Sequence, residues 1–300
     1  MKSPTRRSFL KIGATLGAAA TGVTPTAASA KPRNILSPDR MGVLVDTTVC
    51  IGCRHCEWAC KNSHGLATPP LESYEDQTPF DAMRRPDDTA LTVVNRYPNP
   101  DNAQLPYTVK VQCMHCDHPA CVSACIVGAL SKEENGAVIW DTDKCIGCRY
   151  CMVACPFQVP AFEYSKALDP RILKCDFCFE RRKTGALPAC VEACPVEALS
   201  YGPRDDVVRL AKDRVKRLPD RYVDHVFGEY EVGGTGWVYV AGTDFASLQF
   251  PALGVKPAPG VSESIQHGIF AYFVPPVSLY ALLGVIMWTA RHRGDDEEEH

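Results

Sequence analysis

The chain has 300 residues, of which 46% are hydrophobic, 32 are basic and 35 are acidic, so it is long enough for one or two domains with an ordinary buried core. A slightly acidic chain of this kind gives no reason to expect nucleic-acid binding. It contains sixteen cysteines, an unusually large number. Cysteine at this density indicates disulfides in an exported protein and metal sites in a cytosolic one.

The N-terminus, residues 1–30, has the pattern of an export signal. The segment Thr5–Lys11 (T-R-R-S-F-L-K) resembles a twin-arginine signal, and Ala28–Ala30 (A-S-A) is typical of a cleavage site. Proteins of that route cross the membrane already folded, so metal clusters could be installed in the reducing cytoplasm, where thiols remain free. Removal of this segment takes four basic residues and no acidic ones, which leaves a net charge of −7.

Two similar segments each lead into a cysteine group. Apolar alternation predicts short strands at Met41–Thr48 and Ala137–Trp140. The sequences that follow, C-I-G-C-R-H-C from Cys50 and C-I-G-C-R-Y-C from Cys145, differ at one position in seven. Such self-similarity indicates a duplicated module.

The long segment between the first two cysteine groups is rich in Pro, Asp and Asn. We expect strands at Leu91–Val94 and Tyr107–Val111. Residues 67–107 are interpreted as a surface insertion, which either carries partner contacts or is a solvated hairpin.

Beyond the last cysteine group, we expect Leu199–Pro203 to close the cluster-bearing core. Asp205–Leu218 has the pattern of an amphipathic helix. Gly236–Ala241 is predicted to form a strand, and the Pro- and Gly-rich segment Leu248–Glu263 to be a tether.

The C-terminal region carries a candidate membrane span, residues 267–290. Gly268–Ala290 has no charged residue and is long enough at about 1.5 Å per residue to cross a bilayer. Pro275-Pro276 predict a kink or tilt. Arg291 and Arg293 place the C-terminus in the cytoplasm by the positive-inside rule. A buried core helix is the alternative, and His267 at the outer edge is either an interfacial residue or an aid to a quinol proton step.

The cysteines fall into four groups of four with none left over. The third group, C-I-G-C-R-Y-C-M-V-A-C-P from Cys145 to Pro156, has the C-x2-C-x2-C-x3-C-P spacing of bacterial ferredoxins. Each [4Fe-4S] cube takes four thiolates, so sixteen cysteines predict four clusters. The groups are Cys50, Cys53, Cys56 and Cys60; Cys113, Cys116, Cys121 and Cys125; Cys145, Cys148, Cys151 and Cys155; and Cys175, Cys178, Cys190 and Cys194.

Zinc binding and disulfide formation are two other possible roles of these cysteines. Tandem C-x2-C pairs also bind zinc, but zinc does not account for triplets at steps of three residues with a fourth cysteine four positions on. Disulfides would have poor geometry at such short spacings. The second group departs from the ferredoxin pattern, since Ile126 follows its last cysteine where Pro156 and Pro195 follow others. His55 and His115 lie inside cysteine groups and either tune a cluster or have a plain surface role.

Residues 42–202 resemble the four-cluster iron-sulfur subunits of respiratory oxidoreductases, such as the beta subunit of formate dehydrogenase-N. With the export signal and the C-terminal span, the chain is most similar to the ferredoxin-type subunit of the quinone-linked uptake [NiFe] hydrogenase-2. The segments that carry this similarity are Gln112–Cys116 (Q-C-M-H-C), Gly147–Pro156 (G-C-R-Y-C-M-V-A-C-P) and Ser262–His267 (S-E-S-I-Q-H).

The resemblance implies an α+β fold of two interleaved bacterial-ferredoxin-like modules with extra hairpins, plus one transmembrane helix. It also implies that the first group pairs with the fourth and the second with the third, each lending its last cysteine to its partner. The implied ligand sets are Cys50, Cys53, Cys56 and Cys194 (set A); Cys175, Cys178, Cys190 and Cys60 (set B); Cys113, Cys116, Cys121 and Cys155 (set C); and Cys145, Cys148, Cys151 and Cys125 (set D).

On this basis we expect a periplasm-facing, membrane-anchored electron conduit that does no substrate chemistry itself. Its partners would be [NiFe] hydrogenase large and small subunits and a polytopic quinone-reactive membrane subunit. The alternatives are the same conduit on a molybdenum or tungsten enzyme, and a zinc- or disulfide-stapled anchor. The expected parts are a signal (1–30), a cluster domain (41–205, with 42–66 and 172–205 as one module, 108–165 as the other, and the insertion 67–107), an extension and tether (206–266), a span (267–290) and a cytoplasmic tail (291–300).

Overall fold

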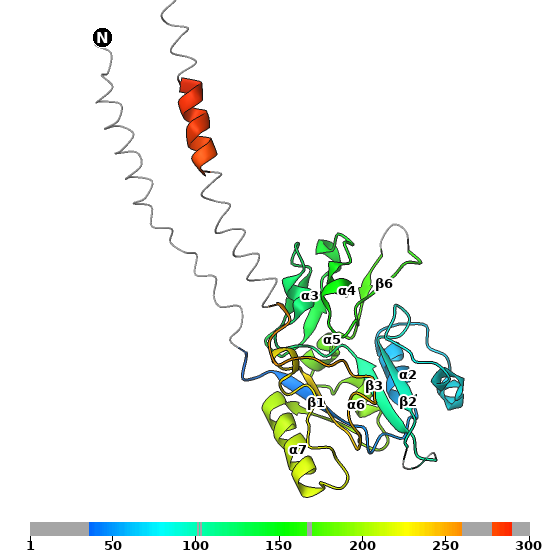
Figure 1. Cartoon of the computed structure of the whole chain (residues 1–300). Coiled ribbons are helices and arrows are strands. Elements are labelled where there is room, and N and C mark those ends of the chain that lie inside the picture. Colours follow the sequence, from blue (N-terminus) through cyan, green and yellow to red (C-terminus); the bar gives the residue numbers. More distant parts are fainter. Residues whose placement is uncertain (1–35, 101, 103, 167–169, 260–277, 290–300) are drawn as a thin grey trace, which may run out of the picture. The chain divides into compact units, whose positions relative to one another are not determined.

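The computed structural model describes residues 36–100, 102, 104–166, 170–259 and 278–289 (Figure 1). The expected signal, the residue His267 and the expected tail at 291–300 lie outside these residues. Of the two units of the chain, Met1–Leu36 and Ser37–His300, the description below concerns the second.

A three-stranded sheet forms the centre of the fold. It consists of β1 (Met41–Asp46), β8 (Leu199–Pro203) and β9 (Trp237–Val240) in the order β8-β1-β9. Strand β1 is antiparallel to β8 and parallel to β9, with Val43 opposite both Tyr201 and Trp237. Strands β1 and β9 lie where the sequence predicts strands, and β8 is the segment expected to close the core. The segment expected to be an extension therefore supplies a core strand, and the structure extends the core past residue 205.

The two faces of this sheet pack against different parts of the chain. Leu44 faces helix α7 (Arg204–Arg217), whose apolar stripe includes Val207 and Ala211. Asp46 is buried at the end of β1 and accepts hydrogen bonds from Arg214 Nη1 (2.8 Å) and Tyr222 OH (2.7 Å), which fix α7 to the sheet. The opposite face is left for the cysteine groups.

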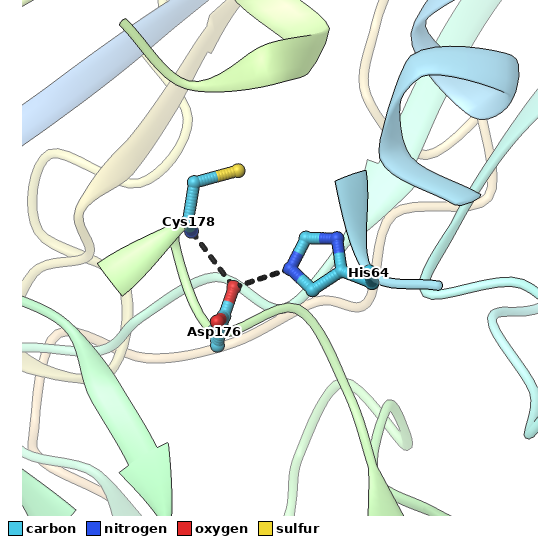
Figure 2. A group of neighbouring side chains, drawn as sticks. All are labelled: His64, Asp176 and Cys178. Atoms are coloured by element: carbon cyan, nitrogen blue, oxygen red, sulfur yellow. Dashed lines mark hydrogen bonds and ion pairs between the residues drawn. The ribbon is translucent and has the colours of Figure 1, made fainter. Parts of the chain in front are cut away.

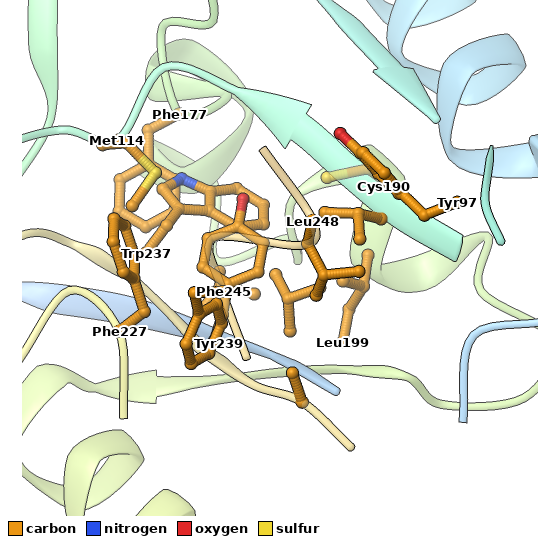
Figure 3. Close-up of a cluster of buried hydrophobic side chains, with 14 of the residues drawn as sticks. Tyr97, Met114, Phe177, Cys190, Leu199, Phe227, Trp237, Tyr239, Phe245 and Leu248 are labelled. Atoms are coloured by element: carbon orange, nitrogen blue, oxygen red, sulfur yellow. The ribbon is translucent and has the colours of Figure 1, made fainter. Parts of the chain in front are cut away.

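That opposite face carries a core of aromatic side chains in contact with cluster-ligand candidates. Figure 3 shows Trp237, Tyr239 and Phe177 together with Cys190 and Leu199. Trp237 and Tyr239 are fully buried. The candidate metal sites therefore rest on the packed face of the sheet, where side-chain packing holds their positions.

The hairpin β2 (Thr92–Tyr97) and β3 (Tyr107–Gln112) differs from the surface insertion expected at 67–107, because β2 is almost wholly buried. The reason is Glu57, a buried carboxylate on helix α2 (His55–Ser63). Its oxygens accept hydrogen bonds from Arg84 Nη2 (2.6 Å) and from the backbone N–H of Val94 (2.6 Å). This carboxylate joins the hairpin to the helix that carries the first cysteine group.

Short elements make up the rest. Each small sheet has two antiparallel strands, and each of the four short helices has four or five residues, too few to be stable alone. They are β4 (Leu130–Lys132) with β5 (Val138–Trp140), β6 (Ala161–Phe162) with β7 (Ile172–Leu173), α3 (Ala120–Ser123), α4 (Tyr150–Ala154), α5 (Phe179–Lys183) and α6 (Ala189–Glu192), with 3-10 turns at Leu71–Glu75, Thr78–Phe80, Thr142–Lys144 and Glu231–Gly233.

Residues 278–289 form a helix with exposed side chains. They are the described part of the expected membrane span 267–290, and the remainder of that span lies outside the described residues. Across the described ranges, every helix is too short or too polar to cross a membrane.

Candidate metal centres

The duplicated C-I-G-C-R-x-C segments adopt the same backbone. Gly52 and Gly147 have φ of 72° and 68°, and Arg54 and Arg149 have φ of 62° and 60°. Left-handed backbone is uncommon for arginine, and at Gly52 a Cβ would approach Thr108 Cγ2 to 2.9 Å. These two left-handed residues curl each loop, so the repeat seen in the sequence is a repeat of conformation.

The other groups reach similar turns with different residues. His115 in the second group and Phe177 and Cys178 in the fourth have positive φ. After the last cysteine of three groups, the third following residue is left-handed and donates its N–H to the cysteine carbonyl, at Gly128 (3.2 Å), Gln158 (3.0 Å) and Glu197 (3.3 Å). The same turn therefore forms whether isoleucine or proline follows the cysteine.

Two of the implied ligand sets each line a cavity. The thiols of set A surround one small, partly open cavity, and those of set D surround another. In both, the fourth cysteine comes from another group, Cys194 in the first and Cys125 in the second. The remaining walls are mostly apolar, and include Val45 and Leu199 in the first and Leu130 and Ile172 in the second.

The mutual effects of the thiols on their pKa values indicate that the members of set B lie close together. Burial raises the pKa of Cys190 to about 11, against an opposing effect of Lys110, and Cys60 and Cys178 raise it further. Burial also raises the pKa of Cys175, and Cys60 is the next largest cause. Cys60, the last cysteine of the first group, therefore lies among those of the fourth.

The same kind of effect indicates that the members of set C lie close together. Burial raises the pKa of Cys116 well above its ordinary value, followed by the neighbouring charges of Cys113, Cys155 and Cys121. Burial raises the pKa of Cys121 to about 12, and Cys113 and Cys155 again contribute. Thiols with raised pKa values become thiolates only when a cation binds them, so these sets need a metal to carry charge.

The donor chemistry fits iron-sulfur clusters. All sixteen cysteines are free of disulfides, and thiolates are the ligands that such clusters use. Trp140 also lines the cavity of set D, and its buried indole N–H has no acceptor among the described residues. A cluster sulfur would supply one.

Burial differs between the sets. All four cysteines of set B are buried, whereas Cys148 of set D is exposed. Ile51 beside set A and Ile146 beside set D are also exposed. Sets A and D therefore approach the surface.

His115 is a fully buried link between two sets. The backbone N–H of Val138 donates to its Nδ1 (2.9 Å), so the ring proton must be on Nε2, which lies 3.5 Å from Cys175 Sγ. Burial, then Lys174, lowers its pKa well below the usual value, which agrees with a neutral ring. A residue from the loop of set C thus donates an N–H to a thiolate of set B, and a surface role is excluded.

Replacement of His115 by phenylalanine is expected to lower the potential of the cluster at Cys175. Hydrogen bonds to cluster sulfurs stabilise the reduced state, and a net worth of about 0.5–1.5 kcal/mol corresponds to roughly 20–60 mV at about 59 mV per decade. A redox titration followed by electron paramagnetic resonance measures it. His115→Gln keeps a donor and should shift less, and an equal shift in both variants would refute the hydrogen-bond explanation.

A second polar group stands beside set B (Figure 2). His64 Nε2 lies 2.8 Å from Asp176 Oδ1, which also accepts the backbone N–H of Cys178 at 2.8 Å. His64 Nδ1 lies 2.8 Å from the carbonyl oxygen of Cys60. Although burial opposes it, the hydrogen bond to Asp176 raises the pKa of His64 to about 11. The trio could hold a metal ion by proximity, but both ring nitrogens of His64 and Asp176 Oδ1 are engaged in hydrogen bonds, and the thiol of Cys178 belongs to set B. The hydrogen bonds tie the end of α2 to the fourth group.

Sequence reasoning missed Lys110. Alternation along β3 places Thr108, Lys110 and Gln112 on one face, and such a polar face is usually solvated. Here all three are buried, because that face lies against the cysteine sets: Lys110 lines the cavity of set A, and Thr108 Oγ1 donates to the carbonyl oxygen of Cys50 at 2.6 Å. The signal was a lysine in a strand that enters a cysteine group.

Comparison with known proteins gives one family match and several relatives. Residues 105–204 match the family described as a 4Fe-4S dicluster domain. The chain is 48% identical over 257 residues to a protein of Nitratidesulfovibrio vulgaris, covering 85% of this chain and 69% of that one. It is 33% identical over 333 residues to the hydrogenase-2 operon protein HybA of Escherichia coli O157:H7 (98% and 99% covered). It is 29% identical over 269 residues to the iron-sulfur subunit of the nitrate-inducible formate dehydrogenase of Escherichia coli K12 (86% and 88%).

Proposed function

The chain belongs to the iron-sulfur electron-transfer subunits of respiratory oxidoreductases, and from this we propose that it relays electrons between a catalytic subunit and a membrane subunit that reduces quinone. Its cofactors are four [4Fe-4S] clusters. When bound, each cluster takes up and gives back one electron. The chain's own residues hold the clusters, exclude water from them and set their potentials.

We assign the ligands as the four sets A to D defined above. The two cavities support sets A and D, and the mutual effects of the thiols on pKa support sets B and C. The interleaved pairing is also favoured by Cys60 and Cys194. Each of these lies with the group at the other end of the cysteine-bearing segment.

The observation that supports the relay is that thiols of successive sets lie near one another, in the order A, B, C, D: Cys56 with Cys190, Cys175 with Cys113, and Cys121 with Cys151. Cys190 of set B is among the charges that raise the pKa of Cys56 in set A, after burial. In the same way Cys113 of set C acts on Cys175 of set B, and Cys151 of set D acts on Cys121 of set C. The inner sets are more buried and the outer ones approach the surface, as entry and exit of electrons require.

A [NiFe] hydrogenase is the catalytic partner that we propose. The relative with nearly full coverage is called a hydrogenase-2 operon protein, and the segments Gln112–Cys116 and Ser262–His267 favour the same choice. The second candidate is a formate dehydrogenase, because the iron-sulfur subunit of such an enzyme also aligns over most of the chain. We further propose a periplasmic location and a single C-terminal anchor, on the sequence patterns at 1–30 and 267–290.

Isolation of the full chain from its native membranes with its partners tests this function. We expect a brown complex with four reducible paramagnetic clusters on this subunit, together with nickel in the catalytic partner. Metal analysis distinguishes the candidates, since molybdenum or tungsten in place of nickel would indicate a formate dehydrogenase type. A colourless chain that lacks iron would refute the relay altogether.

A further inference from the structure

Lys110 is a buried cation at the junction of sets A and B. It lies in the middle of β3, and only 2% of the residue is exposed. It lines the cavity of set A together with Cys56 and Cys194. Lysine is rarely buried unless its charge is compensated. The burial of this ammonium group therefore needs an explanation.

The ammonium group lies in a pocket of neutral polar atoms. Lys110 Nζ donates to Thr92 Oγ1 (2.8 Å) and to Gln112 Oε1 (2.9 Å), and lies 4.5 Å from the centre of the Trp237 ring. The acceptors are held by other hydrogen bonds: the Thr92 hydroxyl donates to Val111 O (3.0 Å), and the Gln112 amide donates to Tyr239 OH (2.6 Å). Both present oxygen lone pairs to the lysine, and the aromatic face favours a cation.

Among the described residues, no carboxylate forms an ion pair with Lys110. The acidic groups beside it are thiols. Cys56 lines the same cavity, and Cys190 packs in the same core as the Trp237 ring that the ammonium group contacts. Cys175 also acts on the lysine. Cys56 belongs to set A, whereas Cys190 and Cys175 belong to set B. A buried charge needs compensation, so the negative charge of the two cysteine sets is what balances this lysine.

We propose that Lys110 is a shared counter-charge for the clusters of sets A and B and raises the potentials of both. This inference rests on the proposed relay. When one electron passes from one cluster to the other, the donor is oxidised and the acceptor is reduced by one electron, and the lysine keeps its proton. A fixed cation stabilises the reduced form of each cluster, because that form carries one more negative charge. Placed at the junction, one cation raises both potentials together and limits the mismatch between them.

The test is a redox titration of the full chain with Lys110→Met, followed by electron paramagnetic resonance. Two of the four midpoint potentials are expected to fall, each by about one decade in the ratio of reduced to oxidised cluster, or about 59 mV for a one-electron couple. The other two should remain. Lys110→Gln removes the charge but keeps a polar group, and should give the same shifts, whereas Lys110→Arg should restore both potentials toward the wild-type values.

Lys132 offers the matched control, because it is a largely buried lysine beside set C and lowers the pKa of Cys116. Because Lys132 Nζ also donates to the carbonyl oxygen of His115 (2.9 Å), whose ring contacts set B, the control is read on set A: Lys132→Met should leave the set A potential unchanged. Unshifted potentials in a Lys110→Gln chain with full iron content would overturn the proposal, as would equal shifts of all four clusters. Iron content and reducible clusters in the wild-type chain test the relay separately, so failure of the relay would appear before any variant is compared.

Discussion

The Cys155→Ser variant is expected to damage the cluster of the second cysteine group and to spare the cluster of its own group. The Cys155 thiol raises the pKa of Cys116 and Cys121 after burial. By contrast, the cysteines that act on Cys151, whose pKa burial raises to about 11, are Cys148, Cys145 and Cys125. A serine ligand binds iron less firmly than a thiolate, because thiolates are the softer donors.

We expect the variant to lose or convert one cluster of four, with signals of a three-iron form or a loss of about a quarter of the iron. Paramagnetic resonance of the dithionite-reduced chain and iron analysis measure this. Cys125→Ser is the reciprocal control and should damage the cluster of set D. Cys148→Ser weakens a ligand that belongs to set D by its own group and so identifies the signals of that cluster. If Cys155→Ser changed the same signals as Cys148→Ser, the interleaved pairing would be wrong.

Much of the local structure could be predicted because it depends on short-range features. The strands at β1, β5 and β9 follow from apolar alternation, and the two C-I-G-C-R-x-C loops share glycine and arginine at left-handed positions. The cysteine spacing likewise predicts iron-sulfur clusters, because ligands three residues apart must bind one centre. These inferences do not require knowledge of which elements pack against one another in the fold.

Long-range packing could not be predicted, and the errors share that cause. Strand β9 lies parallel to β1 although nearly 200 residues separate them, so residues 206–266 looked like an appendage. The β2 strand looked like part of a surface insertion, because the carboxylate that buries it, Glu57, stands on a distant helix. The burial of Lys110 could not be predicted either, because only the fold shows that the polar face of β3 covers the cysteine sets.

Removal of iron is expected to unfold the cluster loops while the sheet and α7 remain folded. The core between α7 and the sheet consists of nine buried residues and includes no cysteine. The core around sets C and D, in contrast, includes Cys121 and Cys151, with Cys125 and Cys145 packed against it. The helices that carry these cysteines have only four or five residues, so metal binding supplies the free energy that orders them.

Hydrogen exchange followed by mass spectrometry, before and after anaerobic chelation of iron, measures this difference. Backbone amides of residues 113–165 should exchange at least about 100-fold faster in the iron-free chain, a loss of about 2.8 kcal/mol in local stability. Amides of β1, β9 and α7 should keep most of their protection, because Leu44, Val208 and Val238 stay packed. Reconstitution with iron and sulfide is the control and should restore the protection of 113–165. Equal loss in both regions would mean that the sheet also depends on the clusters, and unchanged exchange throughout would mean that the thiol loops are ordered by packing alone.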